Sequence, residues 1–570
     1  MTTASRVGAD AQRAVQIIDR AMLDRLPGTS VQAAIAWAVG ADLQSRSPAQ
    51  ADFALRGGTY EQTLILVDGQ RMRDLQTGHF ALDLTVPWDA IERIEIVRGP
   101  GAAQYGADAV GGVVNIITRT QARTARLRSG AFGTVDAGLS AAGRWQGTTA
   151  ALHTDGQRSD GHRAGTDYRM WQVRSTITHV LGSTANSTSR RHRVRADVGI
   201  GVRDFGAATF YAPFDSYERA RTATGNVLYE AQPLGRVATT LRAGVRRHSD
   251  DFILVRNDPS RYRNQHTSLQ SEFEATARVM PRPDLILALG AEALGASLQS
   301  ARLGDRWQRR GAVFGEVRYA GSRFGVHGGT RLDASNDFGA QWVPSIGASV
   351  RVTSAVHLRA LGAGGWRQPT WTDRYYVDPA NQGTPSLIPE RFENRELGLA
   401  VTHADWRLDI AAFQREGTNT IDWVRTRSGP SRIWVATNIG RTDTKGIEWI
   451  SSTPTLAGVR WTMRGTVLRA RLERADAVEG KYALRPLTQS AGVTAQLFEG
   501  RRVWALIDVS HAKRVAEAPY TTVAARLGTR WHRVDGSLEL HNLGQARAID
   551  ASGVPIAGRA VMVGLSWRYG

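Results

Sequence analysis

The segment of this 570-residue chain whose spacing most suggests chemistry is the glycine-rich stretch from Arg98 to Gly112, RGPGAAQYGADAVGG. A glycine-rich loop binds nucleotide phosphates when a lysine and a serine or threonine follow its last glycine. Here Val113 follows Gly112, so the side chains that a nucleotide needs are missing. The glycines instead indicate a chain that turns tightly in a crowded interior.

A second group of residues, HSDD from His248 to Asp251, has side chains that bind cations. Ligands that are adjacent on one loop do not by themselves converge on an ion, so we expect a loop there and no metal site, with calcium binding as the alternative. The chain has no cysteine, and its motifs offer no set of nucleophile, base and orienting group. The sequence therefore predicts no enzyme and no cofactor.

The charge balance is strongly basic, with a formal net charge of +19, and only three of the 72 basic residues are lysines. Clustered arginines bind nucleic acid by neutralising phosphates. In this chain the arginines are scattered rather than gathered in one arm or helix, which favours polar strand faces and argues against nucleic-acid binding. A basic surface is also suited to the phosphates of lipopolysaccharide or to an anionic ligand.

The elements of the first 119 residues indicate a small α+β domain. Short apolar runs at 63–68, 91–98 and 113–118 predict buried strands, since each is bounded by turn residues. Residues 31–41 have helical composition, and Ser30 before them is a good N-cap.

After Arg119 apolar and polar residues alternate strictly to the end of the chain. One example is a hairpin in which Ile346, Val350 and Leu358 lie on the face opposite to Arg351 and other polar residues. No apolar run approaches the roughly 18 residues of a membrane helix. We therefore predict an all-β transmembrane barrel of about 22 antiparallel strands from residues 120–570, with residues 1–119 inside its lumen.

The chain resembles TonB-dependent receptors over most of its length. The resemblance rests on LRG at 55–57, LVDG at 66–69, IERIEIVRGP at 91–100 and the glycine-rich stretch running into VVNIITR, followed by TPSLIPE at 384–390, RELGL at 395–399, ATNIGRTDTKGIE at 436–448 and ELHNL at 539–543. In that family the N-terminal domain is a plug within the barrel. The plug motif positions in this chain are Asp68, Gly69, Gly99, Pro100, Tyr105, Gly106, Gly111, Gly112 and Asn115.

The resemblance also implies two sets of site residues. Two plug arginines, Arg56 and Arg98, are expected to pair with two barrel glutamates, Glu396 and Glu448, and so to latch the plug to the wall. The loop after the strand at 63–68 is expected to form the plug apex. Its candidate ligand-binding residues are Arg71, Arg73, Asp74, Gln76 and His79. Residues 203–222 and 366–378 are further candidate binding loops, because both mix aromatic and charged side chains.

The function that the resemblance implies is active import, across the Gram-negative outer membrane, of a scarce bulky ligand such as a ferric siderophore or cobalamin. The implied partners are the TonB-ExbB-ExbD energy-coupling complex, a metal-chelate or corrinoid ligand, and the lipid and lipopolysaccharide of the outer membrane. We expect a monomer. The alternative is a passive plugged barrel that acts as an adhesin or porin-like surface protein without energy coupling.

The first residues, MTTASRVGADAQRAV, contain no signal peptide, although an outer-membrane barrel must cross the inner membrane. Thr3 to Arg6 resemble the end of the short box through which such receptors engage TonB, without the hydrophobic residues that precede it. We expect the missing residues to lie upstream of Met1.

Overall fold

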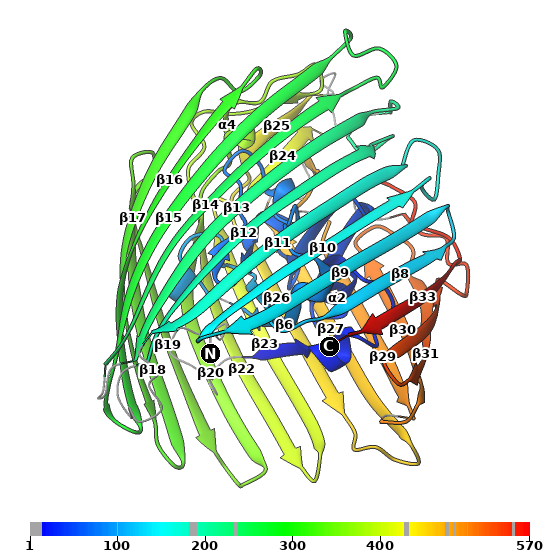
Figure 1. The fold of residues 1–570 in the computed structure, drawn as a ribbon. Helices are drawn as coiled ribbons and strands as arrows, with labels where there is room; N and C mark the ends of the chain where they lie inside the picture. Colours follow the sequence, from blue (N-terminus) through cyan, green and yellow to red (C-terminus); the bar gives the residue numbers. More distant parts are fainter. Residues whose placement is uncertain are drawn as a thin grey trace.

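The structure is a computed structural model that describes residues 14–99, 101–181, 191–211, 213–232, 237–426, 433–473, 478–483, 485–498, 500–549 and 553–569. Within these ranges 22 strands form one closed antiparallel barrel around a smaller N-terminal domain (Figure 1). None of the described helices is long and apolar enough to cross a membrane. The predicted fold class is confirmed.

The barrel closes where its last strand pairs with its first, with Trp567 opposite Ala125 and Met562 opposite Gly130. The barrel strands are β8 (Thr124–Gly130), β9 (Thr134–Trp145), β10 (Thr148–Ser159), β11 (Tyr168–Leu181), β12 (Arg191–Gly206), β13 (Tyr217–Gln232), β14 (Val237–Ile253), β15 (Arg263–Arg282), β16 (Leu285–Ser300), β17 (Arg306–Ala320), β18 (Phe324–Ser335), β19 (Gly339–Arg351), β20 (Val356–Arg367), β22 (Glu390–His403), β23 (Trp406–Thr418), β26 (Thr442–Ser452), β27 (Val459–Leu472), β29 (Leu487–Leu497), β30 (Val503–Arg514), β31 (Tyr520–Trp531), β32 (Val534–His541) and β33 (Ala560–Arg568).

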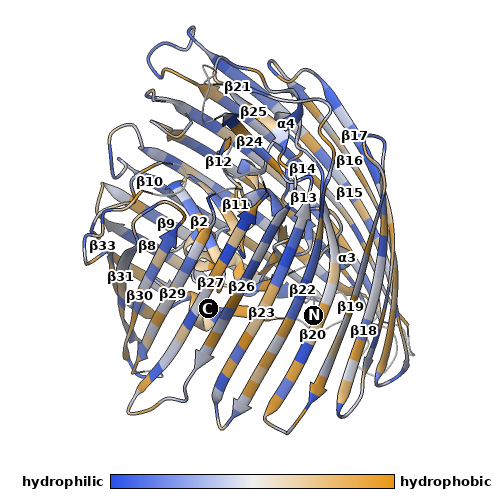
Figure 2. Cartoon of the chain, turned by 180° about the vertical axis from the view of Figure 1, so that it is seen from behind, coloured by the Kyte–Doolittle hydropathy of each residue, from blue (hydrophilic) through white to orange (hydrophobic). Residues whose placement is uncertain are grey.

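Alternation along each strand separates the two faces of the barrel wall (Figure 2). Leu397 is 67% exposed on the outside, whereas its neighbour Glu396 is 3% exposed on the inside. An apolar outer face and a polar lumen are the arrangement of a barrel that spans a lipid bilayer. Because the barrel is closed, no unpaired strand edge is exposed to lipid.

The plug domain fills the lumen. Its main sheet has the order β1-β6-β7-β4-β5, and a separate hairpin joins β2 to β3. The strands are β1 (Val15–Asp19), β2 (Ala41–Ser47), β3 (Gln50–Leu55), β4 (Thr63–Val67), β5 (Gln70–Arg71), β6 (Ile91–Arg98) and β7 (Gly112–Thr118), and the helices are α1 (Arg20–Leu23), α2 (Val31–Ala36) and α3 (Ala102–Tyr105). The sheet ends at Thr118 and the barrel begins at Thr124, so a short linker around residues 119–123 separates them.

The two ends of the barrel differ. One end, here called the turn end, carries short connections such as the one at residues 404–405. The opposite end, the loop end, carries longer connections, with α4 (Trp371–Tyr375) and a four-stranded sheet of β21 (Asn381–Gln382), β25 (Trp434–Asn438), β24 (Ile421–Thr426) and β28 (Val478–Gly480) (Figure 1).

Three local predictions were wrong. The HSDD segment is not a loop, since His248 and Asp250 are buried positions of β14. The prediction failed because strand residues that face a polar lumen have the polar composition of a loop. The helix predicted for residues 31–41 ends at Ala36, and the chain turns at Gly40, whose φ is +72°, into β2. The loop predicted for residues 203–222 is limited to about 207–216, because β12 continues to Gly206 and β13 begins at Tyr217.

Candidate functional site

The four predicted latch residues lie together between the plug and the wall. The Nη1 atom of Arg56 donates to Glu396 Oε2 at 2.8 Å, and its Nε donates to Glu448 Oε2 at 3.0 Å. The Nη1 atom of Arg98 donates to Glu448 Oε1 at 2.8 Å. All four side chains are at most 3% exposed, so each charge depends on its partners rather than on water.

Two further residues, which the sequence did not single out as site residues, complete this network. Asp409 accepts from Arg98 at 2.9 Å, and Arg359 donates to Asp409 at 2.6 Å and to Glu396 at 3.3 Å. The sequence signal was present, because strand alternation already placed both on a polar face. The result is three cations and three carboxylates, for which we use the name anchor network: Arg56, Arg98, Arg359, Glu396, Asp409 and Glu448.

Close approach at two glycines lets the anchor network form. Gly99 has φ +83°, and a side chain there would meet the guanidinium of Arg56. Gly398 lies under Arg359, so that a Cβ atom would collide with the side chain by which Arg359 reaches across β22. Both positions therefore require glycine for a packing reason.

The motif residue Asp68 makes a second link between plug and wall. Its carboxylate accepts from the backbone N–H and the hydroxyl of Thr118 at 2.9 and 2.7 Å, within the plug. It also accepts from Arg174 of β11 and Arg195 of β12, each at 3.0 Å. The plug is thus tied to the wall at β11 and β12 as well as at β22, β23 and β26.

The remaining motif residues shape the plug itself. Asn115 accepts from the N–H of Gly69 at 3.1 Å, and Gly99 donates to the carbonyl of Gly111 at 3.1 Å. Gly106 has φ +74°, and Arg331 of the wall packs where its side chain would lie. Of the other motif positions, Tyr105 and Gly112 are buried, and Pro100 lies outside the described residues.

The candidate apex residues are not on an open loop tip. Arg71 donates to the carbonyl of Tyr105 and pairs with Glu292 of β16 at 3.2 Å. Arg73 forms an ion pair with Asp108, another plug residue. Both arginines therefore lie within the packed plug or at its contact with the wall.

Asp74 and Gln76 also face the barrel. Asp74 accepts from Arg246 of β14 at 2.8 Å and from Ser268 of β15 at 2.5 Å. The side-chain amide of Gln76 donates to Asp250 at 3.3 Å. Four of the five candidates thus contribute to plug packing or plug–wall contact, and none of these four side chains is more than 10% exposed.

His79 is the one candidate that reaches an aromatic cluster. Its ring stacks on Tyr60 with the centroids 4.6 Å apart, and Tyr482 from the loop end lies 6.0 Å from the His79 ring and 5.4 Å from Tyr60. Tyr211, from the connection between β12 and β13, lies 6.1 Å from His79 and is 41% exposed. We call these four residues the apex cluster.

A buried ion pair supports the apex cluster from below. Asp52 contacts the Nδ1 atom of His79 at 2.9 Å and accepts from Arg46 at 2.7 Å. Burial alone would raise the pKa of Asp52, but the charges and hydrogen bonds of His79 and Arg46 lower it to about 2. The carboxylate therefore stays ionised and fixes the imidazole against Tyr60.

The loop-end sheet positions the fourth member of the cluster. Asp422 of β24 accepts from the backbone N–H groups of Tyr482 and Ala483, both at 3.0 Å, and from that of Trp423 at 2.8 Å. Burial raises the pKa of Asp422 to about 7, against these hydrogen bonds, which lower it. Tyr482 is in this way held by a sheet that the alternating pattern of the wall does not predict.

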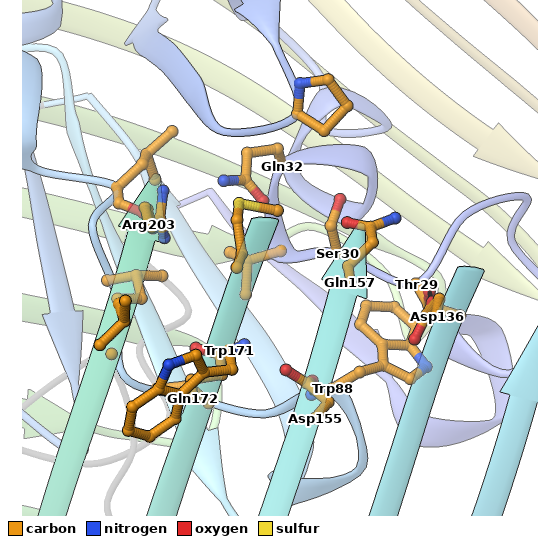
Figure 3. Close-up of a pocket in the computed structure, with 18 residues that line it drawn as sticks. Thr29, Ser30, Gln32, Trp88, Asp136, Asp155, Gln157, Trp171, Gln172 and Arg203 are labelled. Carbon is orange, nitrogen blue, oxygen red and sulfur yellow. Dashed lines mark hydrogen bonds between the residues drawn. The ribbon is translucent and has the colours of Figure 1, made fainter. Parts of the chain in front are cut away.

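A cavity of about 70 Å³ lies beside the plug along β9 to β12 (Figure 3). Thr29, Ser30 and Gln32 of the plug face it on one side. Wall side chains face it on the other: Asp136, Asp155, Gln157, Gln172 and Arg203. Its volume suits a few water molecules rather than a bulky ligand.

No group of three or more His, Cys, Asp or Glu side chains in the described ranges could hold a metal ion. The geometry supports two activities, which are anchoring a plug through buried charges and presenting aromatic rings at its apex.

Comparison with known proteins gives a consistent result. Residues 8–113 match the family model of the TonB-dependent Receptor Plug Domain. The chain is 24% identical over 473 residues to the vitamin B12 transporter BtuB of Vibrio vulnificus (strain YJ016), covering 79% of this chain and 74% of that protein. It is 25% identical over 498 residues to the iron-regulated outer membrane virulence protein of Vibrio cholerae serotype O1, covering 80% and 74%.

Solved structures share the whole architecture. The siderophore receptor PirA from Pseudomonas aeruginosa superposes with a TM-score of 0.78 at 18% identity, covering 98% of this chain and 99% of that one. The ferric yersiniabactin uptake receptor FyuA from Yersinia pestis superposes with a TM-score of 0.79 at 16% identity, covering 99% of both chains. At these identities the likeness establishes the fold.

Proposed function

We propose, from the premise that this chain is a TonB-dependent receptor, that it actively imports a scarce bulky ligand across the Gram-negative outer membrane. The loop end would face the outside and the turn end the periplasm. Residues 1–119 are assigned as the plug and residues 120–570 as the barrel.

The observation that carries the proposal is the anchor network. A barrel of 22 strands is wide enough to hold a channel, and here the plug occupies its lumen. Ligand passage therefore requires part of the plug to move. Separating one partner from a buried ion pair costs about 3 to 5 kcal/mol, and the anchor network contains several such pairs. This cost favours an energy-driven process over passive diffusion.

We assign the energy supply to TonB with ExbB and ExbD, acting from the periplasm on the N-terminal segment of a monomeric receptor. Addition of a peptide strand to a partner sheet is an established route for such capture. The apolar outer face of the wall would contact membrane lipid and lipopolysaccharide. Within this mechanism Arg56, Arg98, Glu396 and Glu448 are the latch that the pull opens.

For the ligand we propose a ferric siderophore or cobalamin. The apex cluster offers tyrosine rings and an imidazole at the junction of plug and loops, and aromatic faces bind flat, polarisable ligands. Arg71, Asp74 and Gln76 would act indirectly, by connecting the apex to β14, β15 and β16 when a ligand binds. Arg73 would act through its ion pair with Asp108 within the plug.

The test is uptake by cells of a Gram-negative host that lacks its own receptors and expresses, behind a foreign signal peptide, this chain preceded by the residues encoded upstream of Met1. Labelled cobalamin and a panel of ferric siderophores are supplied with and without a proton-motive-force inhibitor, in hosts with and without TonB. We expect one ligand class to accumulate only with TonB and an energised membrane. Accumulation that requires neither TonB nor an energised membrane would contradict this proposal and support a passive plugged barrel.

Ligand binding should depend on the apex cluster. The substitution Tyr482→Ala removes the ring that the loop end places against Tyr60. An aromatic contact contributes about 0.5 to 1.5 kcal/mol, so we expect roughly 2- to 12-fold weaker ligand binding. The measurement is whole-cell binding of the identified ligand at 4 °C. Tyr319→Ala, in β17 near the turn end, is the control and should bind as the unaltered chain does.

A further inference from the structure

A second cavity lies near the turn end, between the plug and the strands at the barrel seam. It has a volume of about 140 Å³, which is twice that of the cavity in Figure 3. The wall strands β31, β32, β33 and β8 line one side, and Trp88, Asp89 and Arg119 of the plug and linker line the other. Its wall side includes Ser537, Gly564 and Ser566, whose side chains are small or absent.

The lining of this cavity is rich in arginine. It includes only three carboxylates, Asp24, Asp89 and Asp535. It includes six guanidinium groups, those of Arg119, Arg126, Arg128, Arg526, Arg530 and Arg568. We call this space the arginine cavity. The cavity in Figure 3 has the opposite balance, with Asp136 and Asp155 against the single cation Arg203.

Three of these arginines keep an unused donor, which is Nη2 in Arg126 and Nε in Arg128 and Arg526. Arg128 is 5% exposed, with its terminal nitrogens bonded to Asp136 at 2.8 Å and Glu539 at 2.5 Å, but its Nε has no acceptor among the described residues. Arg526 donates to the carbonyl of Leu26 at 2.9 Å, and its Nε also lacks an acceptor there. Buried donors without acceptors are costly, and a bound acceptor would relieve that cost.

The linker residue Arg119 adds a further cation on the plug side of the cavity, where the carboxylates of Asp24, Asp89 and Glu92 offset its charge in part. Arg119 donates to the carbonyl of Asp89 at 2.8 Å rather than to a carboxylate. Burial, together with the nearby cation Arg20, lowers the pKa of Arg119. A negative group in the arginine cavity would offset this repulsion.

We propose that the arginine cavity binds a small tetrahedral oxyanion of the phosphate class, either free phosphate or the phosphate group of a monoester. Guanidinium groups bind phosphate oxygens bidentately, and arginines from several directions can surround a tetrahedral ion. The volume admits one such ion with water and excludes a bulky ligand. Because the ion would contact the linker and four wall strands at once, it would hold the plug in place at the turn end.

Binding of an oxyanion at this site does not depend on import of the main ligand and requires only the folded chain. The experiment uses the full chain purified in a neutral detergent and tris buffer. Inorganic phosphate and glycerol phosphate are titrated calorimetrically, with sodium chloride at matched ionic strength as the reference. Thermal unfolding is followed in parallel, since a ligand that binds the folded state raises the melting temperature with its concentration.

Two variants probe the site without removing its buried ion pairs. Ser566→Gln fills the cavity and leaves every charge in place. Arg568→Gln removes a half-exposed cation that lines the cavity, its side chain being 46% exposed. The matched control is Arg533→Gln, an exposed residue of the adjacent turn that does not line the cavity.

For the native chain we expect saturable binding of phosphate and a rise in melting temperature. Binding should be at least tenfold weaker for Ser566→Gln and weaker for Arg568→Gln. The control Arg533→Gln should bind as the native chain does. Binding of glycerol phosphate as well would identify a monoester as the natural source, whereas binding of inorganic phosphate alone would identify the free ion. The proposal is overturned if chloride gives the same shift, if binding does not saturate, or if the folded Ser566→Gln variant binds phosphate as tightly as the native chain.

Discussion

At the scale of single residues, Glu448 has the central place in the anchor network. It accepts from both Arg56 and Arg98, and it is fully buried in the wall. Buried paired charges are stable only as a set, because removing one member leaves the others desolvated and unpaired. The anchor network is therefore strong while intact and fragile to any single loss.

Replacing Glu448→Gln should loosen the plug. Two arginines lose a buried carboxylate, and we expect a cost of about 3 to 5 kcal/mol in the plug–wall contact. The measurement is single-channel conductance in planar bilayers, in which the variant should open more often than the native barrel. Glu393→Gln is the control, since the Glu393 side chain is 74% exposed on the same strand β22. Equal conductance for Glu448→Gln and the native chain would contradict the anchoring role.

The Asp52 carboxylate gives the apex a pH dependence. Its pKa of about 2 in the folded chain is below the roughly 3.9 of an unfolded aspartate. A lowered pKa contributes stability that is fully present above about pH 4 and is lost as the pH falls toward 2. The difference between the two pKa values corresponds to about 2.5 kcal/mol.

The melting temperature of Asp52→Asn should accordingly be well below that of the native chain at pH 6, and the difference should shrink as the pH approaches 2. Exposed Asp305 is the control position, and Asp305→Asn should change the melting temperature little at either pH. A difference for Asp52→Asn that is constant from pH 6 to pH 2 would show that its ion pair does not stabilise the fold.

At the scale of elements, one strand sets the geometry of the anchor network. On β22 the inward positions alternate between Glu396, which joins the network, and Gly398, which leaves room for Arg359 to cross from β20 toward Asp409 of β23. The network thus depends on a missing side chain as much as on the charged ones.

Replacing Gly398→Ala should displace Arg359 and destabilise the chain by about 1 to 3 kcal/mol, the usual cost of overpacking. The same change in an Arg359→Ala background should cost much less, because the colliding group is gone. The measurement is a double-mutant cycle that compares the melting temperatures of the native chain, the two single variants and the double variant. Additive effects would exclude the proposed collision.

Sequence reasoning reached the elements whose signals are local. The strands of the plug and wall follow from short apolar runs and from alternation, and Arg56, Arg98, Glu396 and Glu448 lie in motifs of the family that the chain resembles. Asp409 and Arg359 were not reached as partners, because their contact depends on side-chain reach across Gly398. The loop-end sheet was not reached either, since β21 pairs with β25 across more than 50 residues of chain. The HSDD segment was misjudged because lumen-facing strand residues have loop-like composition.

At the scale of the whole molecule, the plug is attached to opposite parts of the wall. The anchor network lies at β20 to β26, the Asp68 link at β11 and β12, and a further contact joins the hydroxyls of Thr85 and Thr224 at 2.7 Å. Import requires some of these contacts to separate in each cycle. Cross-linking can therefore show which of these contacts separate during import.

The pair Thr85→Cys and Thr224→Cys should form a disulfide, because side-chain oxygens at 2.7 Å place the two β-carbons within reach of one another. The chain has no cysteine of its own, so this bridge would be unambiguous. We expect oxidation to abolish uptake while leaving ligand binding intact, and reduction to restore uptake.

The control bridge lies within the wall, between Ser249→Cys of β14 and Thr267→Cys of β15, whose hydroxyls are 3.1 Å apart. It should leave uptake unchanged under the same oxidation. Full uptake by the oxidised Thr85–Thr224 pair would show that this part of the plug stays fixed during transport.

The seam between β33 and β8 also determines the order in which the molecule can assemble. Residues 124–130 pair with the adjacent strand β9 on one side, but their partners on the other side are residues 562–568, so that side of the first wall strand remains unpaired until the last strand has been synthesised. Contacts so distant in sequence form slowly. The plug directly precedes β8, and it can enter the unfinished lumen sideways through this gap. We expect closure of the seam to enclose a plug that is already in position, so that the last pairing of the wall also fixes the plug in place.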